Sequence, residues 1–107
     1  MHDLIITEPA RKDIQEAFDW WRDHRSAVQA ERWYSGTYEA IGTLRRDPER
    51  CAKSPETDLL RQGVRQLLIG IGQRPTHRIV FTVSKNVVTI LRVRHSSQGE
   101  LRPDDVM

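Results

Sequence analysis

Apolar residues recur every three or four positions in two stretches of the first half of the chain, which is the spacing of one face of an α-helix. The first stretch begins after Thr7, a residue type that caps helices, and ends near Arg25. The second begins after Ser26 and ends before Pro48, which stops a helix. Because almost no linker separates them, the pattern predicts an antiparallel helix hairpin.

The remaining apolar runs are short and typical of strands. One run, at residues 2–6, precedes the first helix, and three more follow a loop at residues 48–62. These three are rich in β-branched residues, are joined by turns, and cover residues 64–69, 77–83 and 87–94.

The predicted order is therefore strand, helix, helix, strand, strand, strand, an α+β fold in one domain over residues 1–107. Short turns make the last three strands antiparallel, and we expect an antiparallel sheet with the helix hairpin packed on one face. The opposite face is then expected to be open. Residues 96–107 are polar and are interpreted as a mobile tail or one short helical turn.

Composition is that of a globular protein. Of the 107 residues, 30% are charged and 37% are hydrophobic, which argues against a disordered chain. No apolar run approaches the roughly 20 residues that cross a bilayer, and the N-terminus does not resemble a signal peptide. The lone Cys51 has no partner for an internal disulfide. We therefore expect a cytoplasmic protein.

The net charge of +2 conceals an uneven distribution. Residues 1–60 contain nine Lys and Arg against twelve Asp and Glu, whereas residues 61–102 contain eight basic residues and one acid, Glu100. A basic half predicts either a polyanion or an acidic protein segment as partner.

Several arginines lie on the predicted strands, where a planar guanidinium can bind phosphate or carboxylate with two hydrogen bonds. Clustered on neighbouring strands they indicate a functional site, although a solvated face is the alternative. His95 ends the last strand and is a possible general acid or base, or simply a surface histidine. Histidines and Cys51 are too scattered to form a metal site, and no cofactor is expected.

Most aromatic residues of the helix hairpin have the spacing of core residues. Trp20 and Trp21 are adjacent, however, so both cannot face the same core. We expect one of them to cover a helix junction or to lie beneath a partner.

Taken in order, these segments resemble the RelE/ParE superfamily of toxins from type II toxin–antitoxin systems, also known as plasmid stabilisation proteins. The resemblance extends over about residues 3–98 and rests on residues 6–14, 64–67, 77–83 and 88–95. It implies a growth-inhibiting toxin that a cognate antitoxin masks. RelE-like members cut mRNA on the ribosome without a metal ion, and ParE-like members inhibit DNA gyrase.

Residue by residue, the resemblance assigns catalytic roles to Arg65, Arg78 and His95 if the protein is a ribonuclease. Ser96 and Ser97 stand where RNA-cutting members have a tyrosine, which removes a base and a stacking surface. That departure and the long helix hairpin slightly favour gyrase inhibition. A ribosome-dependent endoribonuclease and an inactive member that only binds antitoxin are the alternatives. The resemblance assigns no role to the other basic residues; their charge and strand positions predict partner or phosphate binding by Arg61, Arg92, Arg94, Lys85 and His77.

Overall fold

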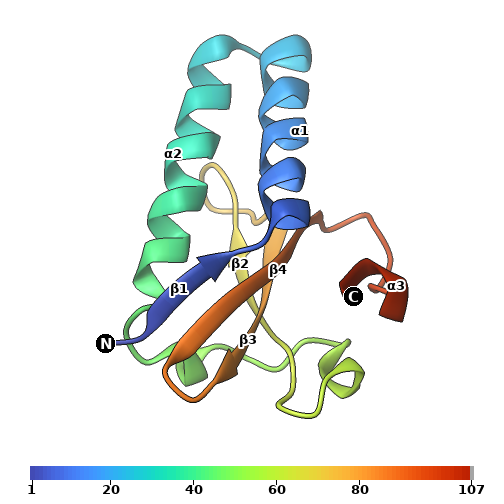
Figure 1. Cartoon of the computed structure of the whole chain (residues 1–107). Coiled ribbons are helices and arrows are strands. Elements are labelled where there is room, and N and C mark those ends of the chain that lie inside the picture. The colour runs from blue at the N-terminus through green and yellow to red at the C-terminus, as the bar shows by residue number, and fades with distance from the viewer. Residues whose placement is uncertain (107) are drawn as a thin grey trace.

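A computed structural model describes residues 1–106 of the chain, and it contains the predicted helix hairpin and strands (Figure 1). Two 3-10 turns and a short C-terminal helix complete it. The elements are β1 (Asp3–Ile6), α1 (Glu8–His24), α2 (Ala27–Thr43), η1 (Pro48–Arg50), η2 (Thr57–Leu59), β2 (Arg65–Ile69), β3 (His77–Ser84), β4 (Val87–His95) and α3 (Pro103–Val106). Among these residues, no helix is both long and apolar enough to span a membrane.

The four strands form one mixed sheet in the order β1-β4-β3-β2. The last three strands are antiparallel as predicted, but β1 runs parallel to β4, with Asp3 opposite Val87 and Ile6 opposite Ile90. The expected fully antiparallel sheet is therefore wrong at this edge. Tight turns dictate antiparallel pairing, and β1 is connected to the other strands only through the helix hairpin, so no turn constrains its direction.

Both predicted helix caps are present. The Thr7 hydroxyl accepts a hydrogen bond from the Ala10 N–H (3.3 Å) and lies 2.8 Å from the Ile90 carbonyl oxygen, to which it donates. Ser26 accepts from the Gln29 N–H (3.1 Å). Thr7 therefore joins the start of α1 to β4, and this contact fixes where the helix leaves the sheet.

The main hydrophobic core lies between the helix hairpin and the sheet (Figure 1). Ile14 from α1 and Ile41 from α2 pack there against Phe81 of β3 and Ile90 of β4, and all four are almost completely buried. Trp33 is 2% exposed in the same cluster. The 3.6-residue periodicity of the helices and the alternation of the strands converge on this layer.

A second, smaller core covers the other face of the sheet. Val64, Val80 and Leu91 pack there with Leu101 from the C-terminal segment, and Leu59, Leu60 and Val106 border them. The expected open face is therefore wrong at this position. Leu101 is only 5% exposed, so the segment expected to be a mobile tail contributes to the core. The predicted short helical turn is α3.

Candidate functional site

The pairing of the strands decides which predicted site residues share a face of the sheet. Arg78 lies opposite Arg94, and Arg92 lies opposite Val80, so all three are on the face away from the helices. Arg65 lies opposite Phe81, whose side chain belongs to the main core on the helix side. The side chains of Arg65 and Arg78 therefore leave the sheet on opposite faces, and the structure does not bring the two guanidinium groups together.

Arg78 is a buried ion-pair residue, only 9% exposed. Its guanidinium donates to both carboxylate oxygens of Glu56, at 2.8 Å for Oε1, and to Gln66 Oε1 at 3.2 Å. Glu56 also accepts from the Leu101 N–H at 2.8 Å. Burial alone raises the pKa of Glu56, but the hydrogen bonds from Arg78 and Leu101 outweigh burial and lower this pKa to about 2. The charge of Arg78 is thus balanced within the protein.

Arg92 is likewise held by an acid. Its Nε and Nη2 donate to the two carboxylate oxygens of Asp13 at 2.7 and 2.8 Å, and Asp105 lies 3.7 Å from Nη1. Asp13 also accepts from the backbone N–H of Val93 at 2.9 Å. This N–H lies beyond the end of β1, whose pairing with β4 stops at Ile90. The hydrogen bond that Arg92 donates to Asp13, with the charges of nearby carboxylates, outweighs burial and raises the pKa of Arg92. The pair with Asp13 joins α1 to β4, and the approach of Asp105 joins α3 to β4.

The other basic residues are spread over the molecule. Arg65 donates to the Cys51 and Glu49 carbonyl oxygens at 2.7 and 3.2 Å, and therefore holds the loop before β2. Arg94 donates to the Gly99 carbonyl at 3.2 Å, and its buried Nε has no partner within residues 1–106. Arg61 and Lys85 are exposed on separate turns. Of the predicted basic residues, Arg78, Arg92 and Arg94 therefore share one face of the sheet, whereas Arg65, Arg61 and Lys85 lie elsewhere.

Two histidines do lie together. His77 and His95 are opposite each other on β3 and β4, with ring centroids 5.0 Å apart and ring planes at 87°. His77 also packs on Trp33, and its Nδ1 lies 2.8 Å from Thr76 Oγ1. Burial, with a smaller contribution from the charge of His95, lowers the pKa of His77 to about 4. His77 is therefore uncharged at neutral pH.

His95 is exposed and oriented by the segment that follows it. Its Nδ1 accepts from the Ser97 N–H at 3.0 Å and lies 2.7 Å from Ser97 Oγ, while its backbone N–H donates to Gln98 Oε1 at 2.8 Å. Because Nδ1 is the acceptor, a neutral His95 carries its proton on Nε2.

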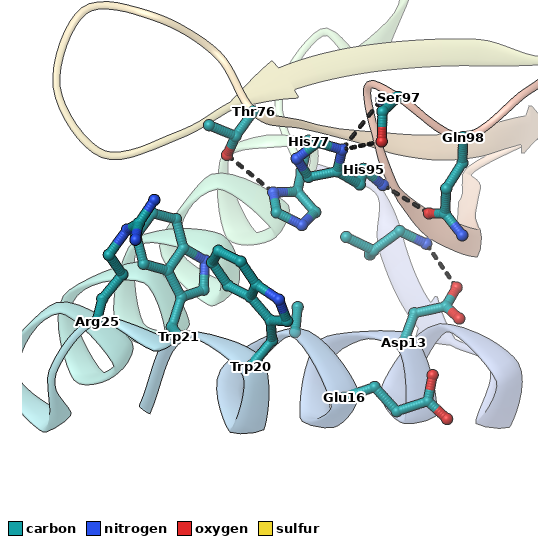
Figure 2. Close-up of a pocket in the computed structure, with 12 residues that line it drawn as sticks. Asp13, Glu16, Trp20, Trp21, Arg25, Thr76, His77, His95, Ser97 and Gln98 are labelled. Atoms are coloured by element: carbon teal, nitrogen blue, oxygen red, sulfur yellow. Dashed lines mark hydrogen bonds between the residues drawn. The ribbon is translucent and has the colours of Figure 1, made fainter. Parts of the chain in front are cut away.

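These histidines form one wall of a pocket of about 560 Å³ whose other wall is α1 (Figure 2). Trp20 is 46% exposed at this wall; His24 stacks on it at 4.8 Å, and Arg25 lies 5.5 Å from its ring centre. The residues that line the pocket are Asp13, Glu16, Ala17, Trp20, Trp21, Arg25, Thr76, His77, Val93, His95, Ser97 and Gln98.

Residues 4–99 match the family model for the ParE toxin of the type II toxin–antitoxin system parDE. The chain belongs to the ParE toxin family. This confirms the predicted superfamily and the assignment as the toxin component of a type II system, for which a cognate antitoxin is the partner.

The fold is also similar to that of a solved structure. The ParE-family chain superimposes on a chain from the chromosomal ParDE system of P. aeruginosa with a TM-score of 0.71 and 21% identity, covering 89% of this chain and 96% of that one. A copper-bound mutant toxin from Helicobacter pylori matches less well, with a TM-score of 0.45, 18% identity, and coverage of 91% and 97%. No curated protein sequence matches the chain.

In this ParE-family toxin, sequence reasoning missed the acids that neutralise the arginines. Glu56 lies in a loop 22 residues before Arg78, and Asp13 lies in α1, 79 residues before Arg92. No pattern of neighbouring residues in the sequence indicates either pairing. The pocket, in contrast, had one signal, since the adjacent Trp20 and Trp21 cannot both be buried in one core. Trp20 is the exposed member of the pair.

Proposed function

We propose that this toxin arrests growth by binding DNA gyrase, and that it does not cut mRNA. The observation that carries the proposal is the internal pairing of the arginines. Arg78 is bound to Glu56, and Arg92 is bound to Asp13, each in a two-point fork. A carboxylate already occupies the donors that a scissile phosphate would need.

The positions of the three residues assigned to catalysis support the same proposal. A ribonuclease of this fold needs arginines and an acid–base group around one phosphate. Arg65 is on the helix side of the sheet, where it binds backbone carbonyls, and Arg78 is on the opposite side. His95 is next to His77 at the pocket, away from both of these contacts.

The cellular setting follows from this proposal. The cognate antitoxin keeps the toxin inactive through direct contact, and toxicity appears when the antitoxin is lost. Gyrase acts on the chromosome, so the proposal places the protein in the cytoplasm.

The test is induction of the toxin without its antitoxin, followed by analysis of both DNA and mRNA. We expect growth arrest, gyrase-linked DNA breaks and intact transcripts, and we expect purified toxin to inhibit supercoiling by purified gyrase. The double variant Arg78→Met with Glu56→Gln removes both charges of the ion pair and leaves the region without net charge, so the growth arrest should be unchanged.

Two outcomes would contradict the proposal. Codon-phased mRNA cleavage that disappears with His95→Ala would establish the ribonuclease alternative. Unimpaired growth with abundant folded toxin would indicate a member that only binds its antitoxin.

A further inference from the structure

We propose that the pocket between α1 and the ends of β3 and β4 receives an apolar anchor side chain of the antitoxin, next to a carboxylate that binds Arg25. This inference rests on the proposed function only in that the occupant is the cognate antitoxin. The family gives the antitoxin as partner but does not say which residues of this chain bind it. The inference names the pocket that binds the antitoxin and the kinds of side chain that the pocket accepts.

The apolar part of the argument comes from the two tryptophans. Trp20 is 46% exposed although it is one of the largest apolar side chains in the protein. Trp21 lines the same pocket, and its ring meets that of Trp20 edge to face with centroids 5.6 Å apart. Exposed tryptophan beside a pocket is the usual anchor of a protein interface.

The charged residues of the pocket indicate which charge the antitoxin carries next to its apolar anchor. Figure 2 shows Arg25 at one end of the pocket and Asp13 with Glu16 at the other. Arg25 donates only to the His24 carbonyl at 3.4 Å, and none of the ion pairs within residues 1–106 includes it. Asp13 is already occupied by Arg92. Glu16 is in no ion pair within residues 1–106 either, so the pocket has a carboxylate at one end and the Arg25 guanidinium at the other. Arg25 is the charge beside the exposed Trp20, 5.5 Å from its ring centre, and a carboxylate next to the anchor complements it.

The wall opposite the tryptophans supports an apolar occupant. His77 is 8% exposed, and its lowered pKa keeps it neutral at physiological pH. Val93 and Ala17 complete the floor of the pocket. An uncharged floor beneath a charged rim is the arrangement of a protein-binding hot spot, in which the rim excludes water from the anchor.

A pair of neighbouring serines offers a matched test. Ser97 lines the pocket, whereas Ser96 is exposed on the same turn and does not line it. We expect Ser97→Trp to fill the pocket and to weaken binding of the antitoxin encoded beside the toxin gene by about tenfold or more. Ser96→Trp should bind as the wild type does. Calorimetric titration of full-length purified proteins measures both, after circular dichroism has shown that each variant is folded.

A charge reversal provides an independent test. Arg25→Glu should also weaken the antitoxin by about tenfold, while Arg46→Glu, an exposed arginine after the far end of α2, should not. Wild-type affinity in both Ser97→Trp and Arg25→Glu would overturn the proposal. So would an RNA oligonucleotide that binds the pocket variants less tightly while the antitoxin binds them normally.

Growth assays separate this inference from the proposed function. If Ser97→Trp arrests growth but escapes neutralisation, the pocket assignment holds, and the DNA and mRNA analysis of the arrested cells decides the proposed function separately. If Ser97→Trp is toxic and still neutralised, the pocket assignment fails and the toxin assignment stands. If even the wild type fails to arrest growth, the proposed function fails, and the titration alone decides the pocket.

Discussion

Arg78 and Glu56 illustrate how a residue type can suggest one role and its surroundings another. The Glu56 side chain is 1% exposed and that of Arg78 is 11% exposed, so each charge depends on the other for stabilisation. A strand arginine looks the same in sequence whether it binds a substrate phosphate or a structural carboxylate. The acid that decides between these roles is 22 residues away.

We therefore expect Arg78→Met alone to destabilise the protein by about 3–5 kcal/mol, because it leaves a buried carboxylate unpaired. Adding Glu56→Gln should recover more than half of this loss, since the amide oxygen still accepts from the Leu101 N–H. Urea unfolding of the two variants and the wild type measures the difference. Equal stabilities of the single and double variants would show that the pair does not interact as described.

His77 gives the fold a dependence on pH. Its pKa falls from 6.5 to about 4 on folding, because of burial and then His95, so the unfolded chain binds more protons between these values. The stability contributed by neutral His77 is present above pH 6.5 and is lost as the pH falls toward 4. We expect the free energy of unfolding to drop by about 1 kcal/mol between about pH 7 and pH 5, after allowance for solvent screening.

His77→Phe should remove most of this drop while keeping the ring contact with Trp33. His24→Phe, at an exposed histidine, is the control and should keep it. Urea titrations at the two pH values measure each difference. A pH dependence in His77→Phe equal to that of the wild type would mean that another group is responsible.

At the scale of elements, local patterns determine most of what is present. Thr7 and Ser26 mark the helix starts, and periodicity predicts both helices and the last three strands, because each signal acts within a few residues. The direction of β1 and the covering of the second sheet face escape prediction. Both depend on contacts between segments more than 30 residues apart, such as Thr7 with Ile90 and Glu56 with Leu101.

The same limit explains the outcome for the site. Sequence patterns identified His77 and His95 as candidates, and strand pairing brings them together. The arginines were expected to converge because they lie on neighbouring strands. Arg78, Arg92 and Arg94 do share one face, but register and loop conformation give each of them a different internal partner, and neither property can be read from strand alternation alone.

At the scale of the whole molecule, the sheet is a central layer with apolar residues packed on both faces. The helix hairpin covers one face, and the loop at residues 56–60 with the C-terminal segment covers the other (Figure 1). The C-terminal segment is held at several points. Leu101 is buried, its N–H is bound by Glu56, and Asp105 binds the Arg102 N–H and approaches Arg92.

Because Leu101 completes the second core, its truncation tests whether the C-terminal segment belongs to the folded unit. We expect Leu101→Ala to lower the free energy of unfolding by about 2–3 kcal/mol, through lost burial and the cavity that remains. Leu68→Ala removes the same atoms from a residue that is 55% exposed and should cost well under about 1 kcal/mol. Urea unfolding of the two variants compares them directly. Equal costs would mean that the segment detaches in solution, and that Val80 and Leu91 are then left uncovered on the sheet.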